Sequence, residues 1–153
     1  MSLLSYLQDG LNLCDLALLI NREAVGVFFA ISGYHKLFNA KRHATLVETL
    51  RDNGIPLVGI NQWFVPAVEF LGGLAVVSGI LPVLAAAGMF TIVLVATLTD
   101  GAKRIGAYEP LNAADWCCDL LYLPEVLYGF MLLVVMIGGP GKYSLPNLLF
   151  AIL

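Results

Sequence analysis

Charged residues are scarce in this sequence: they make up 12% of its 153 residues, while 59% of the residues are hydrophobic. A soluble domain carries about 25% charged residues, so the polar surface of a water-exposed fold is missing. The mean hydropathy is +0.86, which indicates an integral membrane protein in contact with the lipid bilayer. The eight Lys and Arg residues form no basic run, and therefore no nucleic-acid partner is expected.

Cysteine and histidine are also rare, with three Cys and two His in the whole chain. The sequence has no Cys-x-x-Cys motif and too few thiols for a four-thiolate cluster, so neither structural zinc nor an iron–sulfur centre is expected. Two histidines are too few for a membrane dihaem site, and no haem is expected. Cys117 and Cys118 are adjacent but lie among acidic residues, which disfavour a reactive thiolate; their redox role stays open.

Four stretches approach the roughly 20 apolar residues that a membrane-spanning helix needs. They are residues 15–37, 61–80, 82–99 and 120–138. Together they use more than half of the chain, which leaves room for one membrane domain over residues 1–153. The sequence therefore predicts an all-α fold, an integral membrane four-helix bundle.

The connecting segments predict how these helices are joined. Between the first two, Leu46, Val47 and Leu50 recur at helical spacing among charges, which is typical of a short amphipathic helix at the membrane interface. Only the Leu81–Pro82 corner separates the second and third helices, so they should be antiparallel neighbours. A polar loop is expected over residues 100–119. Residues 1–10 are expected to be retained and to lie along the interface.

The basic residues are unevenly distributed between the two predicted sides of the membrane. Six of them follow the first and third helices: Lys36, Lys41, Arg42, Arg51, Lys103 and Arg104. The side with the termini has only Arg22 and Lys142. The positive-inside rule then places both loops in the cytoplasm and both termini outside. The expected location is a bacterial or archaeal inner membrane, as a multi-pass protein.

Arg22 and Lys36 lie within the first predicted span, on one helical stripe with Gly26, Phe29 and Gly33. Small residues allow close helix contact, and charges that face lipid cost several kcal/mol. This stripe should therefore face the protein interior.

The second and fourth predicted spans each contain a carboxylate that should also face inward. Glu69 is flanked by glycines, and Glu125 shares a helix face with Tyr122 and Tyr128. Comparing depths in the membrane, we expect Arg22 to pair with Glu69 and Lys36 to pair with Glu125. Intramembrane ionisable residues are candidate functional groups, but such pairs can also serve only to fix helix register.

Four motifs in this order resemble the DoxX family of small four-helix membrane proteins. They are Gly-Tyr-His-Lys at 33–36, Asn-Gly-Ile-Pro at 53–56, Glu-Phe-Leu-Gly-Gly at 69–73 and Gly-Pro-Gly-Lys-Tyr-Ser-Leu at 139–145. The likeness runs from about residue 22 to residue 149. By position, the family pattern marks Arg22, Gly33, Lys36, Pro56, Glu69, Gly72, Gly73, Gly139, Gly141 and Ser144. Pro146 stands where the family often has an acid.

The resemblance implies a small membrane subunit associated with oxidoreductases, in some relatives a quinone-reducing one. A quinone site needs an apolar slot, donors to the ring carbonyls and a carboxylate that exchanges protons. We expect a catalytic Glu69, with ligand-binding roles for Arg22, Lys36, Tyr122, Glu125 and Tyr128. Electrons should come from a partner redox subunit. The alternative is a non-catalytic membrane anchor or assembly factor for a partner complex or a homo-oligomer; a transporter is disfavoured because no inverted repeat is present.

Overall fold

The computed structural model describes residues 13–150, with the side chains of 148 and 150 left aside, and this part of the chain is helical without strands. The prediction for residues 1–10 lies outside it. The long helices come first: α2 Cys14–Phe38, α3 Ala40–Asp52, α4 Val58–Ser78 and α5 Pro82–Ala96. A π-helical stretch follows, η1 Thr97–Gly101, and then α6 Ala102–Ala107, α7 Ala113–Tyr122, α8 Pro124–Gly138 and α9 Leu145–Phe150.

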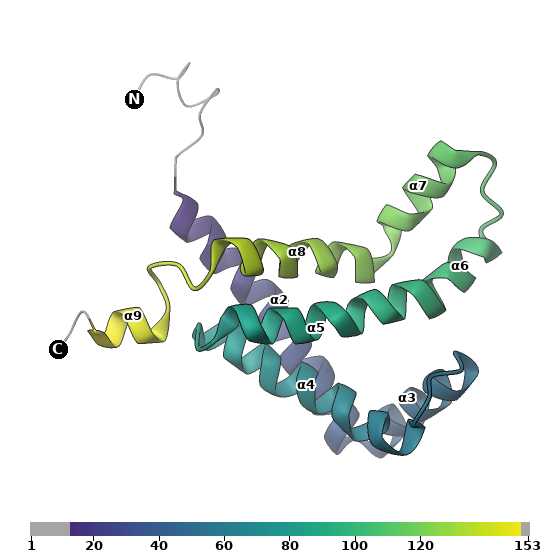
Figure 1. Ribbon diagram of the computed structural model, residues 1–153, viewed down its shortest axis with the longest axis horizontal. Coiled ribbons are helices and arrows are strands. Elements are labelled where there is room, and N and C mark those ends of the chain that lie inside the picture. The colour runs from purple at the N-terminus through teal and green to yellow at the C-terminus, as the bar shows by residue number, and fades with distance from the viewer. Residues whose placement is uncertain (1–12, 151–153) are drawn as a thin grey trace.

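Four helices pack around one core. α2 contacts both α4 and α8, and α5 contacts the same two helices. Figure 1 shows α5 and α8 running side by side, with α2 crossing behind them and α4 beside it. Eight buried residues fill the space between them: Val25, Phe29, Val76, Ala86, Met89, Val93, Leu132 and Val135. The predicted antiparallel pairing of the second and third helices is confirmed as α4 and α5.

Large apolar side chains cover the outside of these helices. Leu71, Leu84 and Ile137 are exposed by 63%, 71% and 86%. A soluble protein rarely exposes so many large apolar side chains, whereas lipid is a suitable neighbour for them. The chain is a membrane protein with an all-helical fold.

Within residues 13–150, two helices are long and apolar enough to cross a membrane: α4, and the continuous helix over Pro82–Ala107. The pair α7 and α8 qualifies as a third span if its 71° bend is counted as one broken span. α2 fills the first predicted stretch with one 25-residue helix, but it is not among these candidates. Its charges include Asp15, Arg22, Glu23 and Lys36.

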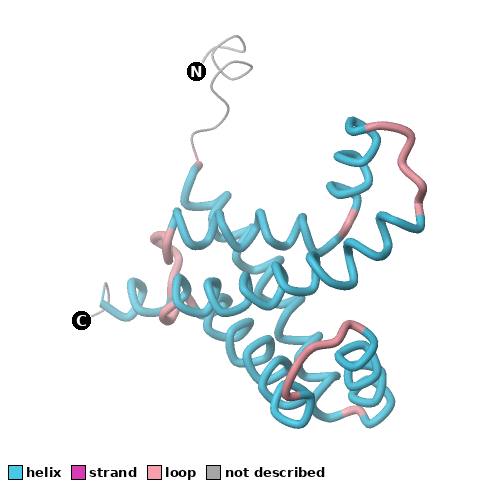
Figure 2. Tube along the Cα trace, turned by 45° about the vertical axis from the view of Figure 1, so that its right-hand side comes forward, coloured by secondary structure: helices cyan, strands magenta, loops and turns pink. Residues whose placement is uncertain are grey.

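The predicted polar loop over residues 100–119 is wrong. The helix that begins at Pro82 continues through η1 and α6 to Ala107, and α7 begins at Ala113. The predicted fourth span, 120–138, is also interrupted, because Leu123 adopts an extended conformation between α7 and α8. The residue before a proline avoids helical geometry, and Pro124 follows here. Figure 2 shows α7 turned away from the other helices by this break.

The predicted amphipathic segment is confirmed as helix α3. The Asn39 side chain caps its start by accepting a hydrogen bond from the Arg42 backbone N–H. The chain turns after Asp52 through Gly54, whose φ is +65°. The Lys103 ammonium donates to the Asp52 carbonyl at 2.8 Å, so the two basic segments lie at the same end of the molecule. Their side of the membrane stays a prediction.

Candidate functional site

Glu69 is a buried carboxylate on α4, with only 4% of its surface exposed. The Lys36 ammonium donates to both of its oxygens, Oε1 at 2.7 Å and Oε2 at 2.6 Å. The Ser32 hydroxyl donates to Oε2 at 3.2 Å. Ser32 and Lys36 are one helical turn apart on α2, so both face the same point on α4. The site is therefore a charge pair with a neutral donor beside it, and its carboxylate is almost fully enclosed.

The Lys36 side of the pair is the more open one. The Lys36 side chain is 28% exposed, against 5% for the Glu69 side chain. The carbonyl of Lys36 also lies 3.0 Å from the His43 ring Nδ1, which fastens α3 to the end of α2. The His43 ring lies 4.4 Å from the ring of Trp63 on α4. α3 thus closes one end of the α2–α4 pair next to the charged site.

Glycines bring α2 and α4 close enough for this pairing. A Cβ added at Gly33 would lie 2.6 Å from the Pro66 carbonyl oxygen, and one added at Gly73 would lie 2.6 Å from the Gly26 carbonyl oxygen. Both neighbours are backbone atoms and cannot swing away. The inward glycine faces predicted on both helices are confirmed, since Gly26, Gly33, Gly72 and Gly73 are buried. Their function here is close helix approach.

The expected pairing of Arg22 with Glu69 is wrong. Arg22 is 3% exposed, but its Nη1 donates to the Pro140 carbonyl and its Nη2 donates to the Tyr143 carbonyl at 2.9 Å. The nearest carboxylate paired with it is Glu23, at 3.6 Å. Lys36 is fourteen residues along α2, a rise of about 21 Å. Arg22 and Glu69 therefore belong to two separate polar centres.

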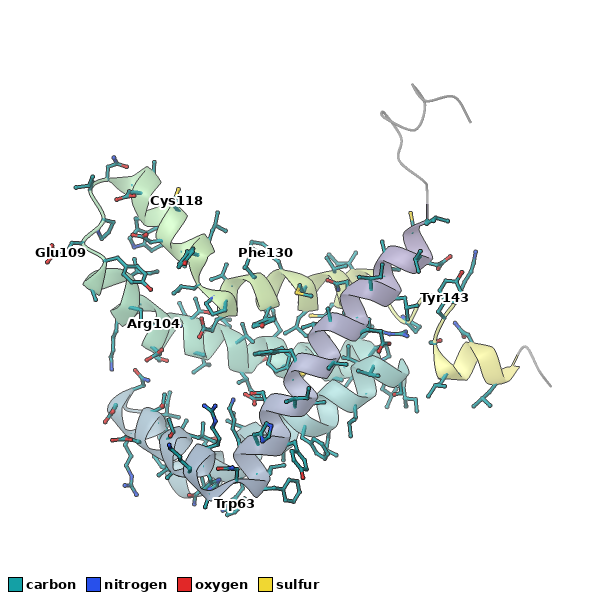
Figure 3. All side chains as sticks on the ribbon, turned by 180° about the vertical axis from the view of Figure 1, so that it is seen from behind. Trp63, Arg104, Glu109, Cys118, Phe130 and Tyr143 are labelled. Atoms are coloured by element: carbon teal, nitrogen blue, oxygen red, sulfur yellow. The ribbon has the colours of Figure 1, made fainter. Side chains whose placement is uncertain are left out.

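The expected pairing of Lys36 with Glu125 is also wrong. Glu125, near the start of α8, forms an ion pair with Arg104 Nη2 at 2.6 Å. Arg104 Nε also lies 3.2 Å from Asp100. The π-helical turn η1 lies directly before α6 and contains Asp100, and such turns occur often at functional sites. This third charged group joins α6 to α8, away from Tyr143 at the other end of the molecule (Figure 3).

The two candidate tyrosines lie in different surroundings. Tyr128 stacks on Phe28, with ring centroids 4.0 Å apart, and packs edge-on against Phe29 at 5.8 Å. It belongs to the packing between α2 and α8. Tyr122, the last residue of α7, is 80% exposed. The structure thus brings together Lys36 and Glu69 of the predicted set, and it places the other four members elsewhere.

Three residues that contribute to these centres were missed in the sequence: Ser32, Asp100 and Arg104. Each stands four residues from a partner on the same helical face, Ser32 before Lys36 and Asp100 before Arg104. That spacing was the available signal. Cys117 and Cys118 are exposed free thiols on α7, and Figure 3 shows Cys118 on the part of α7 far from Tyr143.

A comparison with protein-family models matches residues 17–101 to DoxX. The match covers α2 from residue 17 onward, α3, α4, α5 and the π-helical turn, and therefore both halves of the Lys36–Glu69 pair. Searches of curated proteins and of solved structures gave no match. The family match covers more than half of the chain and contains the first three motifs seen in the sequence, while the fourth, at 139–145, lies outside it. This membrane protein belongs to the DoxX family.

Proposed function

We propose that the chain is a quinone-binding membrane subunit of an oxidoreductase system, with its site at the Lys36–Glu69 pair. The observation that carries the proposal is the buried carboxylate of Glu69, held by an ammonium and a hydroxyl from one neighbouring helix. A structural ion pair needs no third donor. The proposed topology is four spans, formed by α2, α4, α5 with α6, and α8, with the basic segments in the cytoplasm.

The side chains at this pair are of the chemical types that bind a quinone head group. A quinone accepts two electrons and two protons, and in this proposal a partner redox subunit delivers the electrons. Lys36 is a cationic donor for one ring carbonyl, and Ser32 is a neutral donor beside it. When Lys36 turns to a ligand, Glu69 would take up a proton from water on the exposed Lys36 side and release it to the reduced ring, and the second proton would come from water by the same route. The partly exposed Lys36 side is the proposed entry.

The site proposed here is narrower than the six residues expected from the sequence. Arg22 and Glu125 have partners of their own, Tyr128 is packed between aromatic rings, and Tyr122 is exposed. The quinone proposal therefore depends on Ser32, Lys36 and Glu69 alone.

Glu69→Gln tests the proposal, because it keeps the size of the side chain and removes its charge. We expect the purified complex to assemble, to lose most of its quinone-dependent turnover and to keep bound quinone. Glu125→Gln is the matched control: it makes the same chemical change in another ion pair of the same fold and should keep turnover. Normal turnover of the Glu69→Gln complex contradicts the proposal.

The alternative function is a non-catalytic anchor or assembly factor for a partner complex. One observation favours it: Lys36 already bonds both oxygens of Glu69 at short distance, so the pair is complete without a ligand. In that case Glu69→Gln and Lys36→Met should both reduce the amount of assembled complex. Lipid extracts of the purified wild-type complex should then contain no quinone.

A further inference from the structure

A second polar centre lies at the other end of α2, around Arg22. Its guanidinium is 3% exposed and donates to two carbonyls of the turn that follows α8. Gly79 ends α4 beside it, with φ +73°; a Cβ at Gly79 would lie 2.8 Å from Arg22 Nη1 and 2.6 Å from Ser144 Cβ. Arg22 and Ser144 thus meet at one point, over the end of α4.

This centre has unmet hydrogen-bonding capacity. Among the residues that the structure describes, Arg22 Nε and Ser144 Oγ are both buried and have no hydrogen-bond partner. Ser144 is fully buried, at 0% exposure. Leaving a buried donor unsatisfied costs about 1–3 kcal/mol, and more for a charged group. A ligand oxygen that accepts from this donor would remove that cost.

An open groove of about 700 Å³ adjoins the centre. Its lining includes Arg22, Glu23, Ser78 and Tyr143 and is otherwise apolar, mainly from Leu74, Val77 and Ile80. The groove thus combines a buried cation with an apolar lining, which are the two features that an anionic amphiphile requires. Glu23, whose side chain is 40% exposed, lies 3.6 Å from the buried Arg22 Nη2 and offsets part of its charge.

We propose that this groove binds the anionic head group of an amphiphile, a phosphate or a carboxylate, with its alkyl chain along the α4 wall. Arg22 is the charged donor, since a guanidinium binds carboxylate and phosphate oxygens through several N–H groups. The proposal does not depend on the quinone site. Arg22 and Lys36 are separated by about 21 Å along α2.

The test measures binding of four defined probes to the purified full chain in neutral detergent, by native mass spectrometry. The probes are oleate, dioleoyl phosphatidylglycerol, dioleoyl phosphatidylcholine and a short-chain ubiquinone. We expect the two anionic amphiphiles to bind. Phosphatidylcholine should bind at least about tenfold more weakly, because the loss of one charge-assisted hydrogen bond lowers the affinity by about that factor. Oleate and phosphatidylglycerol together tell whether a carboxylate or a phosphate is preferred.

Variants of the protein test whether the anionic probes bind in the groove. Arg22→Gln should weaken anionic binding about tenfold, and Glu23→Gln should strengthen it by removing a like charge. Lys142→Gln is the matched control, because Lys142 carries the same charge on the turn that Arg22 contacts but is 82% exposed and paired with Asp15; it should leave binding unchanged. Ala75→Leu narrows the groove without touching Arg22 and should weaken binding even if Arg22→Gln folds poorly.

Three results would overturn the proposal. One is equal binding of phosphatidylcholine and phosphatidylglycerol. Another is the same loss in Lys142→Gln as in Arg22→Gln, which would mean a diffuse surface charge effect. The third is Arg22-dependent binding of the ubiquinone without any binding of the two anionic amphiphiles.

Discussion

Gly73→Ala should separate α2 from α4 and weaken the Lys36–Glu69 pair. The new Cβ would lie 2.6 Å from the Gly26 carbonyl oxygen, and closer still to the backbone nitrogen of Ala30. Normal contact of a carbon atom needs about 3.5 Å, so the helices must move apart by about 1 Å. Overpacking of this kind costs about 1–3 kcal/mol. The same shift takes the 2.6 Å contact of Lys36 Nζ with Glu69 beyond hydrogen-bond length.

The assay is thermal unfolding of the purified protein in detergent, in wild-type and Lys36→Met backgrounds. Gly73→Ala should lower the unfolding temperature clearly in the wild type and less in Lys36→Met, where no ion pair remains to be lost. Gly88→Ala is the matched control, because its Cβ would meet only the Val68 side chain, at 3.4 Å. The reasoning is refuted if Gly73→Ala is as stable as Gly88→Ala, or if its effect is the same in both backgrounds.

Two further predictions concern the other ion pairs. Arg104→Gln and Glu125→Gln should each destabilise the contact between α6 and α8, and a double-mutant cycle in thermal unfolding should give a coupling of about 0.2–1 kcal/mol, since both side chains are partly exposed; zero coupling would contradict the observed pair. Asp15→Asn should leave the unfolding temperature unchanged, because its partner Lys142 is 82% exposed and the pair is screened by salt. A clear decrease that persists at high salt would contradict this expectation.

The buried faces of the helices could be predicted from spacing alone. On α2, Arg22, Gly26, Phe29 and Gly33 recur every three or four residues, and all four are buried. The same reasoning holds for Glu69 and its neighbouring glycines on α4. A face is a local property of one helix, because only the rise and turn of that helix determine it. The identity of the partner residue depends on a second helix and does not follow from the face.

The segment from residue 97 to residue 123 was the least predictable. Its charges suggested a loop, but Asp100 and Arg104 stabilise one continuous helix by pairing across a turn and then with Glu125 on α8. The π-helical turn inserts an extra residue into a helix and has no clear composition of its own. The break at Leu123 was signalled by Pro124, yet hydropathy across 120–138 is uniform enough to hide a 71° bend.

The register of α2 against α4, which the glycine contacts between the two helices define, explains both pairing errors. Gly26 lies against Gly73, and Gly33 lies against Pro66. A step of seven residues along α2 is thus matched by a step of seven residues back along α4, as antiparallel helices require. Each glycine in fact lies between two residues one turn apart, Gly33 between Pro66 and Phe70 and Gly73 between Gly26 and Ala30. Continued from these midpoints, the register sets Ser32 opposite Glu69 and Arg22 opposite Gly79, which are the neighbours observed.

Membrane depth, measured from the predicted span boundaries, predicts the ion-pair partners less well than the glycine contacts do. The reason is that α4 begins at Val58, three residues before the predicted boundary. Glycine contacts are anchored to the helices themselves and do not depend on where a span is taken to begin. Because α4 ends at Gly79, no carboxylate of α4 lies beside Arg22. Arg22 donates instead to carbonyls of the turn after α8. The register thus places a carboxylate of α4, Glu69, in the centre around Lys36 and none in the centre around Arg22. The buried Arg22 cation can therefore bind an anion from outside the chain.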